Sequence, residues 1–125
     1  VIGSRLSYRF EDPKRGDIAI FRFPDNEKIY YVKRIIGLPG ETVDIVDGKV
    51  YINGSDEPLD EPYIREPMIP EAPMHFEVPE NSYFMMGDNR NYSMDARRWE
   101  NTYVKREKII AKVLFRYFPK PGILK

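Results

Sequence analysis

The chain has 125 residues, a length that favours a single domain. Its 20 basic and 20 acidic side chains give a formal net charge of zero, so the overall charge indicates no nucleic-acid partner, and we expect none. Cysteine is absent and histidine occurs once, as His75, which excludes disulfide scaffolds, thiol catalysis and ordinary Cys/His zinc sites. No apolar stretch is long enough to span a membrane. Because the chain begins at Val1 rather than Met, we expect a fragment that lacks an N-terminal anchor.

Apolar and polar residues alternate with a period of two along most of the chain, which predicts strands rather than helices. The expected strands, in chain order, cover residues 17–23, 29–36, 42–46, 49–53, 82–86 and 109–118. Residues 25–28 are expected to form a polar turn, and Asp47-Gly48 a tight hairpin turn in which both residues have positive φ. A short helical turn is expected within 95–108. The pattern predicts a mainly β fold of curled antiparallel sheets that form a barrel-like structure.

An acidic, proline-rich stretch interrupts this pattern at about residues 55–80, which contain six of the eleven prolines. Proline fixes φ and removes an N–H donor, so the stretch excludes a regular helix or a central strand. Residues 55–86 carry eight acidic groups and one basic group, whereas residues 87–125 carry ten basic and four acidic groups. We interpret the chain as one domain with a core of about 1–54 and 81–125 and an insertion at 55–80.

Lys33 is a candidate general base in the second expected strand. Alternate side chains of a strand share a face, so Lys33 lies on the same face as Tyr31 and Ile35. Burial of an ammonium group among apolar side chains favours its neutral form and lowers its pKa, and a neutral amine can accept a proton. The strand pattern alone favours a simpler alternative, in which Lys33 reaches solvent along an edge strand.

The segment 87–98 contains too many turn-forming residues for a strand. Asparagine and aspartate side chains hydrogen-bond to their own backbone, so such a loop can be rigid. A rigid loop could position Ser93, Asp95 and Arg97 for chemistry. Composition alone favours the simpler alternative of a solvated turn with an incidental salt bridge.

Three blocks of the sequence, taken together, carry a resemblance to a known family. They are Arg15-Gly16-Asp17-Ile18, the run Tyr-Val-Lys-Arg-Ile-Ile-Gly-Leu-Pro-Gly-Glu at 31–41, and Gly87-Asp88-Asn89-Arg90 followed by Ser93 and Asp95. Together these blocks resemble the type I signal peptidases of bacteria, which are membrane-bound serine proteases of the S26 type. The resemblance implies a signal-peptidase fold, a Ser/Lys dyad, removal of signal peptides from exported preproteins, and no cofactor.

The resemblance also implies roles for individual residues. Lys33 corresponds to the catalytic lysine, the general base of the dyad, and Ser93 to a serine that orients this lysine. The supporting charged residues that correspond are Arg34, Asp88, Asp95 and Arg97. The substrate-binding positions that correspond are Tyr31, Val32, Met85 and Met94. The first two lie on a strand beside which an extended signal peptide is expected to bind by strand addition, and the two methionines are expected to line pockets for small side chains.

The nucleophile of this family lies in a Ser-Met-x-Pro block near the end of the membrane anchor, and the chain contains no such block. Ser4 and Ser7 are not followed by Met-x-Pro, and Ser93-Met94 continues with Asp95. Because a dyad needs both members, we expect the chain as given to be inactive. Two alternatives stay open, namely a self-cleaving repressor of the same serine–lysine fold and a non-catalytic homologue that only binds preproteins.

The resemblance implies that the intact protein lies in the cell membrane with its catalytic domain on the extracytoplasmic side. The lipid surface is therefore a second expected partner, reached through the missing anchor, and the basic C-terminal third suits contact with acidic lipid. The acidic groups at 56–80 lack the regular spacing of a calcium loop, so no metal site is expected.

Overall fold

The computed structural model of the protein describes residues 2–4 and 12–115. Its elements are, in chain order, β1 (Ile2–Ser4), β2 (Ile18–Phe23), β3 (Asn26–Gly37), β4 (Thr42–Val46), β5 (Lys49–Ile52), β6 (Met74–Glu77), β7 (Ser82–Met86), β8 (Val104–Lys105), the 3-10 turn η1 (Arg106–Lys108) and β9 (Ile109–Phe115). The predicted mainly β fold is confirmed.

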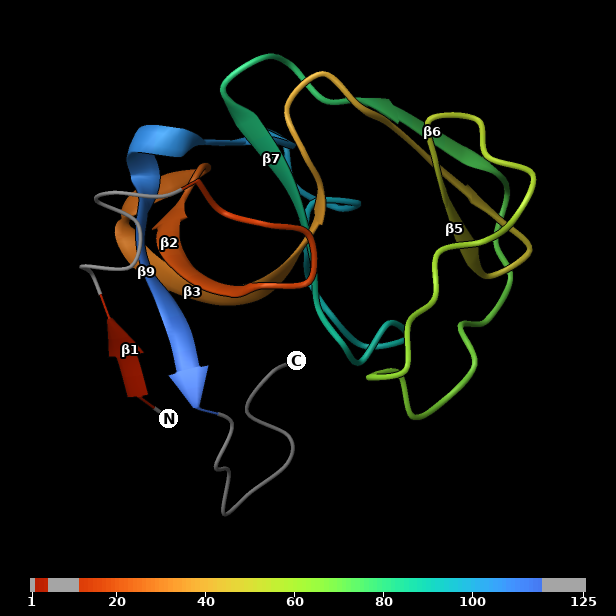
Figure 1. Cartoon of the computed structure of the whole chain (residues 1–125), viewed down its shortest axis with the longest axis horizontal. Helices are drawn as coiled ribbons and strands as arrows, with labels where there is room; N and C mark the ends of the chain where they lie inside the picture. Colours follow the sequence, from red (N-terminus) through yellow and green to blue (C-terminus); the bar gives the residue numbers. More distant parts are fainter. Residues whose placement is uncertain (1, 5–11, 116–125) are drawn as a thin grey trace.

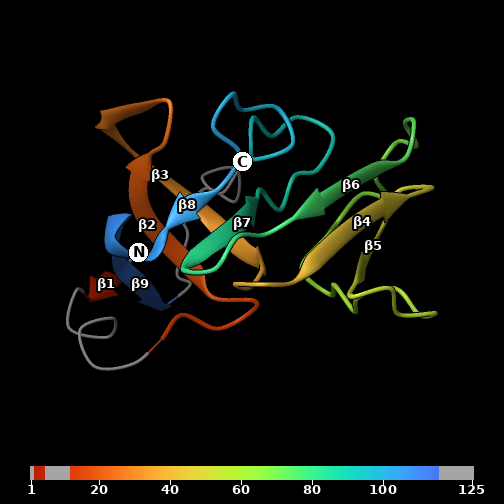
Figure 2. The same ribbon diagram turned by 90° about the horizontal axis from the view of Figure 1, so that it is seen from above.

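The strands form two antiparallel sheets that lie side by side along the longest axis of the molecule (Figures 1 and 2). The large sheet has the order β1-β9-β2-β3-β7-β8, and the small sheet has the order β5-β4-β6. The chain passes from the large sheet to the small one between β3 and β4 and returns between β6 and β7. The large sheet is strongly curled at β2 and β3, but its outer strands β1 and β8 do not pair in the described residues. It is therefore a curled open sheet and not a closed barrel.

Two hairpins test the predicted turns. Asp47 and Gly48 have φ values of 50° and 76°, as the hairpin between β4 and β5 requires, and this prediction is confirmed. The polar turn expected at residues 25–28 is wrong, because Phe23 already pairs with Asn26 and the turn consists of residues 24 and 25 alone. Residues 26–28 extend β3, and they are polar because this end of the strand is exposed.

The described residues contain three short strands that the sequence pattern did not indicate, β1, β6 and β8, and β1 pairs with the edge of β9. β6 lies in the proline-rich stretch, but it is an edge strand of the small sheet, so the exclusion of a central strand holds. β8 has two residues and pairs with the start of β7. The 3-10 turn η1 falls within 95–108 and confirms the short helical turn expected there. The last predicted strand is β9, and residues 116–118 of that prediction lie outside the described residues.

One hydrophobic core runs through both sheets. Its most buried side chains include Phe21, Ile35 and Phe84 from the large sheet and Val43 and Val50 from the small sheet. The main stabilising contribution in such a core is the removal of apolar surface from water, which contributes about 25 cal/mol of free energy for each Å² buried. Because the core is shared, the small sheet supports the strands that carry the candidate site.

Gly37 lies where the two sheets meet, at the end of β3. A Cβ atom at this position would lie 2.8 Å from Val43 Cγ2, 2.9 Å from Phe84 Cβ and 3.0 Å from Val78 Cγ2. These distances are shorter than carbon–carbon contacts allow, so only glycine lets the sheets approach this closely.

Candidate active site

Lys33 is a buried lysine in the middle of the large sheet. Its side chain is 7% exposed, so the alternative in which it reaches solvent along an edge strand is wrong. Its Nζ donates a hydrogen bond to Ser93 Oγ at 3.0 Å, across 60 residues of sequence. Burial lowers the pKa of Lys33, and nearby Arg97 lowers it further, while the carboxylates of Asp95 and Asp88 raise it in part. The net direction is downward, which favours the neutral amine.

An aromatic cluster forms the apolar surroundings of Lys33. The Lys33 Nζ lies 5.7 Å from the centre of the Tyr31 ring. The Tyr31 ring stacks on Phe23 with centroids 4.3 Å apart, and Trp99 meets both rings edge to face. Trp99 also donates from Nε1 to the carbonyl oxygen of Met94 at 3.2 Å. The loop that carries Ser93 is thus fixed over the face of β2 and β3 on which Lys33 lies.

Asp95 organises this loop from within. Its carboxylate is completely buried and accepts hydrogen bonds from the N–H groups of Gly87 and Arg97, at 3.0 and 3.1 Å. The Arg97 guanidinium adds two further bonds to Asp95, at 2.8 and 2.9 Å. The Ser93 N–H donates to the carbonyl of Asn89 at 2.9 Å. With Ser93 and Asp95 both buried, the interpretation of the segment as a solvated turn is wrong.

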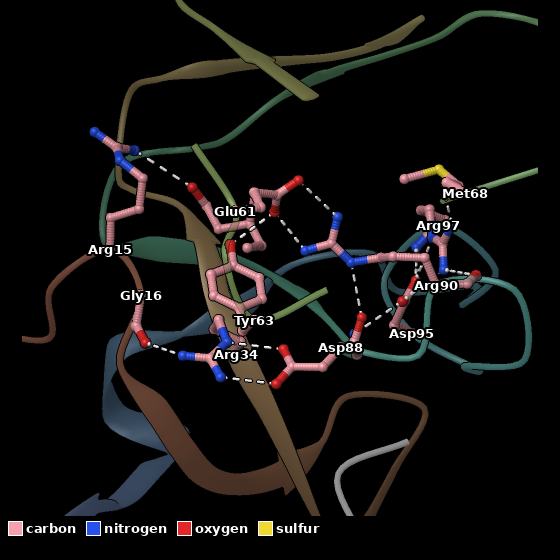
Figure 3. A network of polar contacts seen from close by, with 12 residues as sticks. Arg15, Gly16, Arg34, Glu61, Tyr63, Met68, Asp88, Arg90, Asp95 and Arg97 are labelled. Carbon is pink, nitrogen blue, oxygen red and sulfur yellow. Dashed lines mark hydrogen bonds and ion pairs between the residues drawn. The ribbon is translucent and has the colours of Figure 1, made fainter. Parts of the chain in front are cut away.

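A second set of charges lies beside the first, as Figure 3 shows. Arg34, the neighbour of Lys33 in β3, makes two hydrogen bonds to Asp88 at 2.8 and 2.7 Å and donates to the carbonyl of Gly16 at 2.8 Å. The predicted supporting residues Arg34, Asp88, Asp95 and Arg97 therefore lie close to Lys33 and Ser93 as two adjacent ion pairs.

Three residues of this network, Glu61, Tyr63 and Arg90, had no predicted role, although Arg90 belongs to the block at residues 87–90. Arg90 bonds to both carboxylate oxygens of Glu61, at 3.0 and 2.5 Å, and the Tyr63 hydroxyl donates to Glu61 at 2.7 Å. One signal could have indicated them, because the acidic proline-rich stretch and the basic C-terminal third carry opposite net charges. Opposite charges of that size favour contact between the two segments.

The strand edge beside Lys33 is unpaired in the described residues. β3 pairs with β2 along almost its whole length, whereas β7 pairs with it only from Arg34 onward. Ile35 makes main-chain hydrogen bonds with residues 16 and 17, on the β2 side, each at 2.8 Å. Because such bonds alternate along an antiparallel strand, the N–H and C=O groups of Val32 and Tyr30 point toward the unpaired edge.

The four residues expected to bind substrate occupy different positions around this edge. Tyr31 lies on the face of Lys33, and Val32 packs on the opposite face against Ile18 and its neighbours. Met85 is completely buried in β7, next to Ile35 and therefore on the Lys33 face. Met94 is 62% exposed on the loop. Their role in binding stays a prediction.

The described residues contain neither a membrane-spanning helix nor a metal-binding cluster. No helix in that part of the chain is long and apolar enough to cross a membrane. No group of three or more His, Cys, Asp or Glu side chains is arranged there to hold a metal ion.

Comparison with known proteins assigns the family. The model of the family "Signal peptidase, peptidase S26" matches residues 1–118. The chain belongs to this signal peptidase family. It is similar to the probable signal peptidase I-2 of Synechocystis sp., with 40% identity over 129 residues, 98% of this chain and 56% of the relative. It is also similar to the signal peptidase I of Leptolyngbya laminosa, with 41% identity over 127 residues, 95% of this chain and 60% of the relative.

A solved structure supports the same assignment at the level of the signal-peptidase fold. The crystal structure of a signal peptidase I from Enterococcus faecalis V583 superposes with a TM-score of 0.69 at 33% sequence identity. The match covers 82% of this chain and 97% of that one. The chain spans somewhat more than half the length of these Synechocystis and Leptolyngbya signal peptidases.

Proposed function

We propose that this chain is the catalytic domain of a serine endopeptidase that removes N-terminal signal peptides from exported preproteins. The observation that carries the proposal is the buried Lys33, whose Nζ lies 3.0 Å from Ser93 Oγ. A general base must be neutral before it can take a proton, and burial favours the neutral form of this lysine. The family and the names of the similar proteins agree with the reaction class.

Lys33 is the general base in this proposal, and Ser93 orients it. Ser93 is buried, which suits a residue that holds an amine in place better than one that attacks a substrate. In the acylation step the neutral Lys33 takes the proton of the nucleophilic serine while that oxygen bonds to the substrate carbonyl carbon. The lysine then returns the proton to the leaving amine, and the mature protein is released. Water activated by the same lysine hydrolyses the acyl-enzyme and frees the signal peptide.

The substrate binds in extended form along the unpaired edge of β3. The main-chain groups of Tyr30 and Val32 that point to this edge supply hydrogen bonds for strand addition. Tyr31 places an aromatic ring beside Lys33, and Met85 and Met94 line the pockets for small side chains. The peptide bond to be cut then lies close to Lys33 Nζ.

The nucleophile comes from a Ser-Met-x-Pro block N-terminal to Val1, near a membrane anchor, with the catalytic domain on the extracytoplasmic side. The chain as printed contains no such block and has only one member of the dyad, so it is inactive by itself.

The test is cleavage of a synthetic signal-peptide substrate by detergent-solubilised protein that includes the segment preceding Val1. We expect turnover to rise with pH as the fraction of neutral Lys33 increases through its lowered pKa, and then to level off. Lys33→Ala should reduce turnover at least about 1000-fold, because general-base catalysis and activation of the nucleophile are both lost. Lys105→Ala, at an exposed lysine of β8, is the matched control and should keep full turnover.

Each other outcome would count against part of the proposal. Equal turnover of Lys33→Ala and the unchanged protein would remove Lys33 from the mechanism. Absence of turnover in every form, with retained binding of the peptide, would favour the non-catalytic homologue that only binds preproteins.

A further inference from the structure

The proline-rich segment contacts the loop that carries Ser93 at several points between residues 61 and 71. The side-chain amide of Asn91 accepts from the N–H of Ile69 at 2.7 Å and donates to the carbonyl of Pro67 at 3.2 Å. The Arg97 guanidinium lies 3.7 Å from the sulfur of Met68. Arg98 and Glu71 form an exposed ion pair, and Arg90 and Glu61 form a buried one. Residues 61–71 of the segment are therefore held against the loop by several separate contacts.

The Arg90–Glu61 pair is the most enclosed of these contacts. The Arg90 side chain has no exposed surface, and the Glu61 side chain is 9% exposed. Arg90 also donates from Nε to the carbonyl of Gly87 at 2.8 Å, and its own carbonyl accepts from Arg97 at 2.8 Å. One arginine thus joins the first residue of the loop to Glu61 of the proline-rich segment. Paired guanidinium and carboxylate groups fix geometry as well as charge, because both bonds must align.

Tyr63 connects the same segment to the strand of Lys33. Its hydroxyl donates to Glu61 Oε2 at 2.7 Å. The Arg34 guanidinium lies over its ring, 3.9 Å from the centroid, and Arg90 lies 5.9 Å from the same centroid. Arg34 directly follows Lys33 in β3, so the segment touches both the strand that carries Lys33 and the loop that carries Ser93 (Figure 3).

We infer that Glu61 and Tyr63 are positioning residues, which hold the Ser93 loop against β3 so that Ser93 Oγ stays in contact with Lys33. The inference rests on the proposed function, in which the Lys33–Ser93 contact orients the general base. In this inference the proline-rich segment holds the Ser93 loop in place. Without Glu61 the buried Arg90 loses its carboxylate partner, and the start of the loop is no longer joined to the segment by this ion pair.

The test is Glu61→Gln, which keeps the shape of the side chain and removes its charge. The loosened loop should admit water to Lys33, so the charged amine is better solvated and the Lys33 pKa rises toward that of an exposed lysine. NMR of ¹³C,¹⁵N-labelled lysine measures this pKa in the printed chain without any need for turnover. In protein that includes the preceding segment, kcat at neutral pH should fall about tenfold with KM little changed, and the pH profile should move to higher pH. Glu66→Gln, at an exposed glutamate of the same segment, should change neither readout.

Tyr63→Phe is the second variant, because it removes only the hydroxyl that bonds to Glu61 and keeps the ring under Arg34. It should shift the Lys33 pKa in the same direction by a smaller amount. If Glu61→Gln melts cooperatively with an unchanged Lys33 pKa, or if it fails to fold and Tyr63→Phe leaves that pKa unchanged, the positioning role is wrong. Because this pKa is measured without substrate, absence of turnover would overturn the proposed function and leave the positioning result standing.

Discussion

The buried charges next to Lys33 are arranged so that they largely offset one another. Asp95 attracts a protonated Lys33, but its carboxylate already accepts four hydrogen bonds from Gly87 and Arg97, and the Arg97 guanidinium repels the same ammonium. The Asp88 carboxylate accepts two hydrogen bonds from the Arg34 guanidinium. Because both carboxylates form ion pairs with arginines, burial has the largest influence on the pKa of Lys33, and it lowers this pKa.

Asp95→Asn should therefore be strongly destabilising. An asparagine accepts through one oxygen only, so it leaves the buried Arg97 without a counter-charge, at a cost of about 3 to 5 kcal/mol in the free energy of unfolding. Urea unfolding followed by circular dichroism measures the difference. The matched control is Glu71→Gln, which breaks the exposed pair with Arg98 and should cost less than about 1 kcal/mol. Equal effects of the two variants would contradict this account of the buried pair.

At the scale of single elements, β3 links the parts of the site. It pairs with β2 over most of its length, carries Lys33 and Arg34 at its centre, and ends at Gly37 against the small sheet. β7 joins it only beyond Lys33, which leaves the preceding edge unpaired in the described residues. The position of Gly37 decides how closely the small sheet, and with it the start of the proline-rich segment, approaches this strand.

Gly37→Ala should destabilise the protein although it adds only a methyl group. The new Cβ would lie within 3.0 Å of Val43, Phe84 and Val78, so both sheets must shift, at a cost of about 1 to 3 kcal/mol. Gly54→Ala is the control, since its Cβ would meet no atom within 4 Å and the cost comes only from its positive φ, about 1 kcal/mol. Thermal and urea unfolding of both variants give the comparison, and a smaller loss for Gly37→Ala than for the control would be inconsistent with tight contact.

Elements were predictable from the sequence where their determinants are local. The Asp47-Gly48 hairpin follows from the backbone preference of two adjacent residues, and β2 and β7 follow from alternating apolar side chains. β6 and β8 are too short for such a pattern and depend on distant partners, β4 and β7. The contact between Lys33 and Ser93 also spans distant segments, so the family resemblance indicated it and the local pattern did not. Glu61 was missed for the same reason.

On the scale of the whole molecule, the shared core makes the two sheets depend on each other. Val43 and Val50 of the small sheet belong to the same buried cluster as Phe21 and Ile35 of the large sheet. A packed interior of this kind transmits a local loss of contact to its neighbours. We expect the described part of the chain to unfold as one cooperative unit, which agrees with the interpretation of the chain as one domain.

Val43→Ala tests this dependence. Removal of two buried methyl groups should lower the free energy of unfolding by about 2 kcal/mol. Amide hydrogen exchange should then speed up by a similar factor in β2 of the large sheet and in β5 of the small one. Ile69→Ala, at a residue that is 63% exposed, should change stability by less than about 0.5 kcal/mol. Faster exchange confined to the small sheet would show that the two sheets unfold separately.

The unpaired edge of β3 has a consequence for the behaviour of the protein in solution. Ile29 and Tyr30 lie in this part of β3 and are 44% and 54% exposed, and no strand of the described residues pairs with the main-chain groups of Tyr30 and Val32 that point to the edge. An edge with these properties is a template for pairing with any extended chain, including the same edge of a second molecule. A bound peptide that covers the edge would therefore also act against self-association, and concentrated protein without such a peptide would be the form most prone to aggregate.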